Sequence, residues 1–184
     1  MSFHFNGSDG QHNFRCNLDC ERCQGNAKST GEQCKKVTCK YLPLCFIHLK
    51  QKVLQVKQST IPQGGDGLFT LVARTKYEII GEYTGEVLTN EQLHNRYGND
   101  TAPFAIRAKR NYNIDPACER CFPAYINSAL HTNHQNNCEY IVWHQGGTRV
   151  RVQTTKALPA GAELFIAYSA GYWNNLRGAY LTKK

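Results

Sequence analysis

The chain has 184 residues, of which 41% are hydrophobic and 20% are charged, and its formal net charge is +8. This length fits one domain with a small appendage, and the composition is typical of a folded protein rather than a disordered one. No apolar run reaches the roughly eighteen residues of a membrane span, and the polar residues 1–11 contain no signal-peptide core. These features favour an intracellular protein and no membrane partner.

Positive charge and cysteines both gather in the N-terminal part. Residues 1–58 carry nine Lys and Arg against four Asp and Glu, and six of the nine cysteines precede residue 46. A basic segment favours an anionic partner such as nucleic acid or an acidic protein surface, although it can also simply keep a small protein soluble. In a reducing compartment, such cysteine clusters bind metal more often than they form disulfides.

Residues 1–15 are rich in Gly, Asn, Ser and His and are predicted to be a disordered tail. Residues 16–50 contain few large apolar side chains and a Cys-x10-Cys-x10-Cys-x2-His pattern, formed by Cys23, Cys34, Cys45 and His48. Zinc prefers thiolate and imidazole ligands, and four of them close a tetrahedron that would also supply folding energy. Possible further ligands are Cys16, Cys20 and Cys39; free or buried thiols are the alternative.

Beyond residue 52 the pattern predicts short strands, at 53–57, 68–73, 78–83, 140–144, 148–153 and 164–168. One helix is expected to begin at Thr89, which forms a capping box with Gln92, and to stop at Gly98. The two strands around Gly146 and Gly147 are expected to pair as a hairpin. The body is therefore predicted to be mainly β with short helices.

A second group of metal-type donors lies inside this body. It comprises Cys118, Cys121, His131, His134 and Cys138. Because these residues interrupt a segment that otherwise has the character of a domain core, we interpret the cysteines as small buried thiols.

Four segments of the body carry features that suit a ligand site. They are a glycine-rich turn at 64–69, a strand end at 83–86, a polar stretch at 124–128 and an aromatic strand at 161–168. The glycine turn leaves space for close approach of a ligand, and a buried amide such as Asn127 needs partners. Each segment alone is also typical of an ordinary turn or core strand.

Together and in this order, the segments resemble the SET-domain lysine methyltransferases over residues 53–173. Residues 65–69 are similar to the family's G-x-G turn, and 82–86 to its E-Y-x-G-E segment. Residues 124–129, which follow Ile114-Asp115, are similar to R-F-I-N-H-S, 136–138 to P-N-C, and 161–168 to G-E-E-L-x-x-x-Y. The ending, with Tyr172 and Trp173, is most similar to compact SET proteins of large DNA viruses or protists.

The resemblance implies a SET-domain β-fold with a pseudoknot-like crossing, preceded by the small zinc-binding segment and followed by a tail at 174–184. It also implies an S-adenosylmethionine-dependent protein-lysine N-methyltransferase that acts on histone tails. The expected compartment is the nucleus, or the host nucleus if the protein is viral. The basic head would contact nucleic acid.

By the same resemblance, Tyr168 would be the catalytic tyrosine. The implied cofactor-binding residues are Gly65, Asp66, Gly67, Tyr83, Asn127, Ser128, Tyr168 and Trp173. The implied residues of the substrate channel are Phe104, Tyr125, Ile166 and Tyr172.

Three positions depart from the family pattern. Ala124 replaces the usual arginine, Ser128 the usual histidine and Ala162 the first glutamate of G-E-E. These departures leave open an alternative, a catalytically weak SET-like module that binds chromatin or nucleic acid. A zinc-dependent nucleic-acid binder with an inert body is a third hypothesis, and it would show salt-dependent binding.

Overall fold

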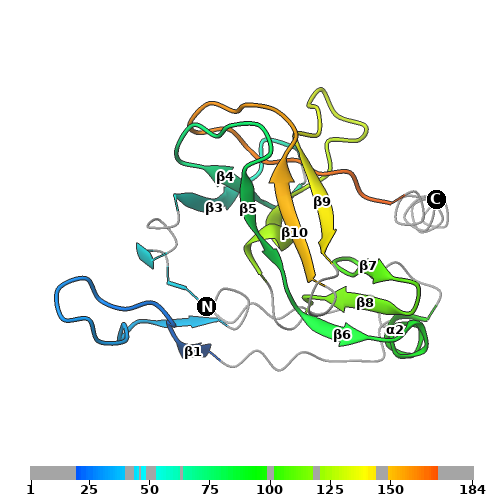
Figure 1. The fold of residues 1–184 in the computed structure, drawn as a ribbon, viewed down its shortest axis with the longest axis horizontal. Coiled ribbons are helices and arrows are strands. Elements are labelled where there is room, and N and C mark those ends of the chain that lie inside the picture. The colour runs from blue at the N-terminus through cyan, green and yellow to red at the C-terminus, as the bar shows by residue number, and fades with distance from the viewer. Residues whose placement is uncertain are drawn as a thin grey trace.

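The computed structural model describes residues 20–39, 44–45, 47–48, 53–62, 64–98, 102–117, 121–143 and 149–169. Short antiparallel strands dominate this part of the chain, and helix α2 lies far from the N-terminal hairpin (Figure 1). No helix among the described residues has the length and apolar character needed to cross a membrane.

The N-terminal head, residues 20–48, begins with a two-stranded hairpin. Strand β1 (Cys20–Arg22) pairs antiparallel with β2 (Val37–Cys39), and Cys20 is opposite Cys39. The connecting loop is held by polar contacts, because the Arg22 guanidinium donates to the carbonyl oxygens of Gln33 (2.6 Å) and Cys34 (2.9 Å). These two hydrogen bonds fix the end of the loop next to β2.

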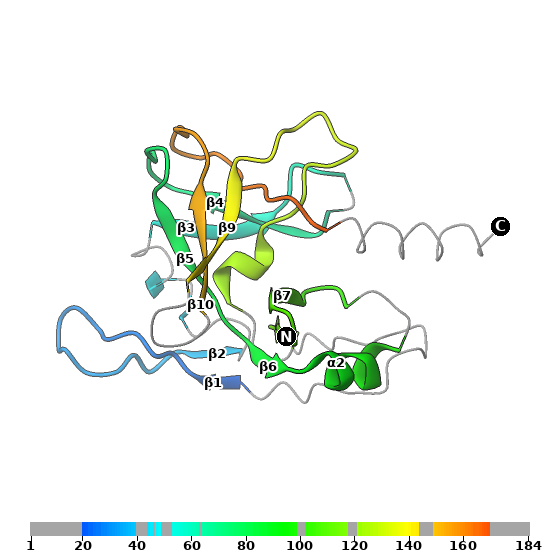
Figure 2. The same ribbon diagram turned by 45° about the vertical axis from the view of Figure 1, so that its right-hand side comes forward.

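The body, residues 53–169, contains three small antiparallel sheets. The first pairs β3 (Leu54–Gln58) with β4 (Asp66–Thr70). The second has the order β5-β10-β9, from Ile79–Tyr83, Arg149–Thr154 and Cys138–Trp143. The third has the order β6-β8-β7, from Glu86–Leu88, Tyr112–Asp115 and Ile106–Lys109. The 3₁₀ turn η1 (Phe122–Tyr125) lies in the middle of the body, between the three-stranded sheets (Figure 2).

Helix α2 (Asn90–Tyr97) confirms the predicted helix and its caps. The Thr89 hydroxyl accepts from the Gln92 amide, the Gln92 side chain accepts from the Thr89 amide, and Gly98 closes the end. Its last turn is anchored to the third sheet, since the buried Tyr97 hydroxyl donates to Asp115 at 2.8 Å. Arg96 adds ion pairs to Glu86 and to the same Asp115 carboxylate.

The predicted hairpin near the C-terminus is confirmed as β9 and β10, in a register that places Trp143 opposite Arg149. The last predicted strand, 164–168, differs from the expectation. It forms only isolated bridges, from Glu163 to Phe69, Phe165 to Asn127 and Ile166 to Cys138. The reason is that this segment contacts several neighbours in turn and follows no one of them for a full strand length.

Those contacts make the pseudoknot-like crossing. The Ile166 amide donates to the Asn127 carbonyl at 2.9 Å, while the Phe165 carbonyl accepts from the Asn137 amide at 2.9 Å. The buried Asn137 side chain fixes the crossing from the other side: it donates to the Glu163 carbonyl (2.9 Å) and accepts from the Phe165 amide (2.8 Å). Residues 163–166 therefore pass between the stretches around 127 and 137 and bring them together.

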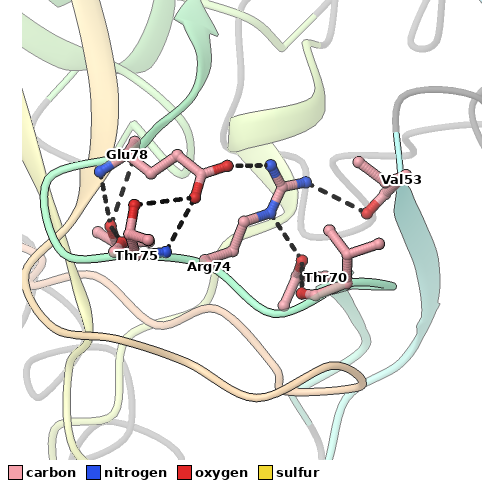
Figure 3. A network of polar contacts seen from close by, with 7 residues as sticks. Val53, Thr70, Arg74, Thr75 and Glu78 are labelled. Carbon is pink, nitrogen blue, oxygen red and sulfur yellow. Dashed lines mark hydrogen bonds and ion pairs between the residues drawn. The ribbon is translucent and has the colours of Figure 1, made fainter.

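A continuous apolar core fills the space between the sheets, with Leu68, Ile114, Ile126, Val150, Val152, Leu164 and Ile166 among its buried members. A polar network closes the edge where the body begins (Figure 3). Its centre is Arg74, which pairs with Glu78 at 2.6 Å and donates to the Thr70 hydroxyl (2.9 Å) and the Val53 carbonyl (3.4 Å). Glu78 in turn accepts from the Thr75 amide and hydroxyl.

Candidate active site and metal centre

The glycine turn leads into β4, and its two glycines Gly65 and Gly67 have different surroundings. Gly65 has a φ of +64°, and nothing lies within 4 Å of the position that a Cβ would take there. At Gly67, in contrast, a Cβ would lie 2.2 Å from a carboxylate oxygen of Glu163. That carboxylate is fixed, because it accepts from the Ser59 hydroxyl at 2.6 Å. The turn thus exposes its backbone to a ligand at Gly65, whereas Gly67 packs against Glu163 and leaves no room for a side chain.

Asn127 connects this turn to the crossing. Its side-chain Nδ2 donates to the Asp66 carbonyl at 3.0 Å, and its own carbonyl accepts from Ile166. The neighbouring Ser128 is buried, and its hydroxyl accepts from the Leu130 amide at 3.3 Å. A ligand that lay along the turn would therefore meet Asn127, whose side chain is only half-buried.

A cavity of about 760 Å³ borders the residues that follow the crossing, Ala167, Tyr168 and Ser169. It is lined by Tyr83, Pro103, Phe104, Ala105, Ile106, Arg107, Asn113, Pro123, Ala124, Ile126, Tyr140, Ala167, Tyr168 and Ser169. This volume and this mixture of aromatic, apolar and a few polar walls are typical of a ligand or substrate site.

Three tyrosines shape the cavity wall. The Tyr168 hydroxyl donates to the Ile126 carbonyl at 2.9 Å, and the Tyr83 hydroxyl donates to the Phe104 carbonyl at 2.6 Å. The Tyr140 ring meets the Tyr83 ring edge to face, with centroids 5.6 Å apart. Burial raises the pKa of Tyr83 well above its ordinary value, so this phenol stays neutral and acts as a hydrogen-bond donor.

The structure separates the residues that the sequence proposed for the site into groups. Tyr83, Phe104 and Tyr168 line the cavity together. The turn and crossing residues lie outside its wall, namely Gly65, Asp66, Gly67, Asn127 and Ser128. Tyr125 and Ile166, proposed for the substrate channel, also lie outside the wall and belong to the core packing, where Ile166 is 1% exposed. Tyr172 and Trp173 lie outside the described residues.

Sequence reasoning did not find Tyr140 and Arg107 as cavity residues. Tyr140 was predicted only as part of a strand, and alternation does not distinguish a side chain that lines a cavity from one that packs in the core. Ala124 was noted as a departure from the family pattern, and it proves to be part of the cavity wall. A bulky side chain at this position would take space from the cavity.

The second donor group does not assemble a metal site among its described members. Cys121 and Cys138 are buried, whereas His131 and His134 are exposed. Burial raises the pKa of Cys138 to about 12, which keeps the thiol neutral. The interpretation as buried thiols therefore holds for these two cysteines, while Cys118 lies outside the described residues.

The head does bring together the four donors of the Cys/His pattern. Their ligand atoms all lie within 4.8 Å of one another. His48 Nδ1 is 3.3 Å from Cys23 Sγ and 3.4 Å from Cys45 Sγ, and the Cys34 and Cys45 sulfurs are 4.0 Å apart. A tetrahedral zinc ion with ordinary bond lengths requires about 3.5 Å between nitrogen and sulfur and about 3.8 Å between sulfurs. The donor set therefore fits zinc in type and spacing.

Neighbouring groups hold these donors in place. His48 Nε2 donates to the Asn26 carbonyl at 2.7 Å, which leaves Nδ1 as the free ligand nitrogen. Cys23 Sγ accepts from the Cys45 amide at 3.1 Å. Gly25 is essential for this packing, because a Cβ there would lie 2.5 Å from the His48 ring. The further candidates Cys20 and Cys39 are opposite each other in the backbone register of β1 and β2, and their side chains are not among those that the structure describes; Cys16 lies outside the described residues.

Local hydrogen bonds favour the ionised form of one ligand. Burial opposes ionisation of Cys45, but hydrogen bonds from the His48 backbone and ring and from Cys23 outweigh it and lower the pKa of Cys45 to about 7. The pKa of His48 is raised, mainly by its hydrogen bond to Cys23. Metal binding requires deprotonated cysteines, so a readily ionised Cys45 suits a metal ligand.

Comparison with known proteins identifies the family to which the body belongs. The SET domain model matches residues 65–169, whereas the search of curated proteins gives no match. Among solved structures, the chain is similar to a humanized mutant of the Chaetomium thermophilum Polycomb Repressive Complex 2 bound to an inhibitor, with 24% identity and a TM-score of 0.57 over 67% of this chain and 16% of that chain.

Two further similar structures are ctPRC2 in an autoinhibited conformation bound to S-adenosylmethionine and an active Polycomb Repressive Complex 2 in the basal state. The first has 21% identity and a TM-score of 0.56 over 71% of this chain and 17% of that chain. The second has 22% identity and a TM-score of 0.55 over 63% and 15%. This chain thus spans about a sixth of the length of the chains that it matches, and at this identity the likeness shows the fold. Since the family model covers more than half of the 184 residues, the chain belongs to the SET-domain family.

Proposed function

We propose that this protein is an S-adenosylmethionine-dependent protein-lysine N-methyltransferase that acts on histone tails. The observation that carries the proposal is the arrangement around the crossing. Asn127 contacts the glycine turn on one side, and two residues beyond Ile166 the Tyr168 side chain reaches the wall of a cavity of substrate size. The proposed cofactor region contacts residues 163–166, and the proposed substrate region contacts residues 167–169 of the same segment.

The turn and Asn127 fit the cofactor. When bound, S-adenosylmethionine supplies a methyl group that its sulfonium charge activates. The open backbone at Gly65 and the half-exposed Asn127 amide would hold its polar parts, and the Ser128 backbone would meet the adenine. One of the similar structures is bound to this cofactor, which supports the assignment.

The cavity residues would then align the substrate. A lysine with a pKa near 10.4 must lose a proton before it can attack, at a cost of roughly 4–5 kcal/mol at neutral pH. Apolar walls such as Phe104 and Ile126 exclude water and lower that pKa. Tyr83 is a neutral donor with its hydroxyl committed to a carbonyl, so it positions groups and does not act as a base.

The decisive experiment is Tyr168→Phe. We expect methyl transfer to core histones, followed by mass spectrometry, to fall at least about 100-fold, because a positioned hydroxyl near the reacting atoms is lost. Cofactor binding, followed by thermal shift with S-adenosylmethionine, should persist. Tyr112→Phe is a matched control, because Tyr112 is exposed and outside the cavity wall. Near-normal turnover by Tyr168→Phe would exclude the proposed mechanism.

The head would serve as a zinc-stabilised docking element that keeps the enzyme on chromatin in the nucleus, or in the host nucleus if the protein is viral. Support comes from the donor geometry and from the excess of Lys and Arg over Asp and Glu in residues 1–58. If it contacts nucleic acid, the affinity must fall steeply with salt. Titration of labelled DNA at several salt concentrations tests this, and binding that is absent or independent of salt would contradict it.

A second candidate function is a SET-like module that binds its partner without efficient catalysis. The specific observation is Ala124, which lies in the cavity wall where the family pattern has arginine. Such a module would bind histone peptides yet transfer no methyl group at saturating cofactor. The histone assay described above separates the two functions.

A further inference from the structure

The wall of the cavity carries one charged side chain among the residues that the structure describes. Arg107 is that residue; the other described lining residues are aromatic, apolar or uncharged polar groups. A lysine side chain that enters such a cavity therefore brings its flanking residues close to a single positive charge. Within the described wall, no carboxylate offsets that charge.

Arg107 differs from the arginines that stabilise the fold. Arg74, Arg96 and Arg149 each form ion pairs, with Glu78, with Glu86 and Asp115, and with Glu82 respectively. Arg107 is exposed, and no ion pair joins it to any residue in the described ranges. Its guanidinium thus keeps donors in a planar fork that fits a carboxylate or a phosphoryl group.

The backbone fixes where Arg107 lies. It belongs to β7, the outer strand of the order β6-β8-β7, and it is opposite Asn113 of β8. Asn113 is buried and held by Asn90 at 2.9 Å. The next basic residues, Lys109 and Arg110, are not part of the cavity wall, and the Lys109 ammonium lies 4.1 Å from the centroid of the Tyr112 ring. The nearest acidic groups of the sheet, Glu86 and Asp115, are already paired with Arg96.

A single positive charge in the cavity wall favours some substrate segments over others by their charge. A neighbouring Lys or Arg on the substrate is repelled, whereas an anionic neighbour gains a charge-assisted hydrogen bond. We infer that the preferred substrate lysine lies within about two residues of an anionic side chain, a carboxylate or a phosphorylated residue, which Arg107 recognises. This inference rests on the proposed function and narrows its substrate class: within histones, it selects acidic or phosphorylated segments over runs of basic residues.

The test uses the full zinc-loaded chain and peptides of equal length that contain a single lysine. The peptides differ only in the flanking positions, which carry Asp, phosphoserine, Ser or Arg, and the Asp and phosphoserine peptides distinguish a carboxylate from a phosphoryl group. We expect the preferred anionic peptide, with Asp or phosphoserine, to have a kcat/KM about three- to tenfold higher than the Ser peptide. The Arg peptide should have the lowest kcat/KM. Arg107→Gln should flatten this order, and Arg107→Glu should reverse it.

Arg110→Gln is the matched control. It removes the same charge from the end of the same strand but does not alter the cavity wall, so the order of the peptides should be unchanged. Equal turnover of all peptides by the wild-type chain, or an order that persists in Arg107→Gln, would overturn the inference.

A binding measurement separates this inference from the proposed function. If no peptide is methylated, including the Ser peptide, the proposed function fails. The charge preference is then decided by fluorescence anisotropy of the same labelled peptides with S-adenosylhomocysteine present. The same order of affinities supports recognition by Arg107, and equal affinities overturn it.

Discussion

The head and the body of this protein are stabilised in different ways. In the described head, the buried side chains are Cys23, Cys45 and His48, all of them metal donors. In the body, buried Leu, Ile, Val and Phe side chains form a continuous core, and polar networks close its edges. If the head depends on a bound zinc ion as proposed, whereas the body depends on apolar burial, a perturbation of one region should leave the other intact.

Removal of the metal should have the largest effect, and it should be confined to the head. A structural zinc site contributes an apparent binding free energy of about 10–16 kcal/mol, and the described head shows no apolar core to replace it. We expect a chelator or Cys45→Ser to abolish zinc binding, measured by elemental analysis, and to unfold the head. NMR signals of the body and its thermal shift with S-adenosylmethionine should persist.

Gly25→Ala sharpens this test without removing a ligand. Its Cβ would lie 2.5 Å from the His48 ring, so the imidazole must move away from the donor cluster and zinc affinity should fall at least about tenfold. Gln24→Ala, at the exposed neighbouring position, is the control and should bind zinc normally. Loss of the body's cooperative unfolding in any of the head variants would show that the two regions are not independent.

A substitution in the glycine turn should destabilise the body and leave the head intact. In Gly67→Ala the new Cβ would lie 2.2 Å from the Glu163 carboxylate, which is held by Ser59. We expect the free energy of unfolding of the body to fall by about 1–3 kcal/mol, measured by thermal or urea unfolding. Zinc content should be unchanged.

The control for this variant is Gly81→Ala. There the nearest atom, Cγ of Pro123, would be 3.5 Å from the new Cβ, an ordinary contact. Equal destabilisation by the two variants would contradict the view that Glu163 packs directly against the turn.

The smallest expected effect concerns the polar network around Arg74, at the edge of the body. The hydrogen-bonded Arg74 guanidinium and the Thr75 amide lower the pKa of Glu78 below its ordinary value of 4.5. The ionised Glu78 therefore contributes stability above that pH, and the contribution is lost as the pH falls through the lowered pKa. Glu78→Gln should lower the free energy of unfolding by about 1 kcal/mol at pH 7, and the difference from wild type should shrink below pH 4.5.

Urea unfolding at several pH values measures this difference. Glu82→Gln is the comparison, because its partner Arg149 is more exposed than Arg74 (52% against 10%) and the loss of that ion pair should matter less. A difference between Glu78→Gln and wild type that does not depend on pH would exclude the ion pair as its cause.

Local signals in the sequence were enough to predict several elements. The capping box at Thr89 and Gln92 predicted where α2 begins, because cap chemistry is contained within four residues. The glycines between residues 144 and 148 and the flanking alternation predicted the β9–β10 hairpin. The strand predicted at 164–168 forms only isolated bridges, because the segment contacts several neighbours in turn, and the local pattern does not indicate those neighbours.

The cavity could be predicted only in part. The family resemblance singled out Tyr83 for the cofactor, Phe104 for the substrate channel and Tyr168 for catalysis, and all three line the cavity. Arg107 and Tyr140 have no sequence signal that separates them from other strand residues. Their proximity depends on two different sheets, which the chain pattern does not place relative to each other.

The sequence by itself determined the composition of the donor set in the head, the cap chemistry of α2 and the family. These properties are carried by residue types at fixed spacings, so they can be read from the chain. Only the tertiary structure decided which nitrogen of His48 is free to bind metal, that Gly67 must lack a side chain, and that one cation borders the cavity. Each depends on contacts between residues far apart in the chain, such as Asn26 with His48 and Glu163 with the glycine turn, and those contacts arise only when the fold has closed.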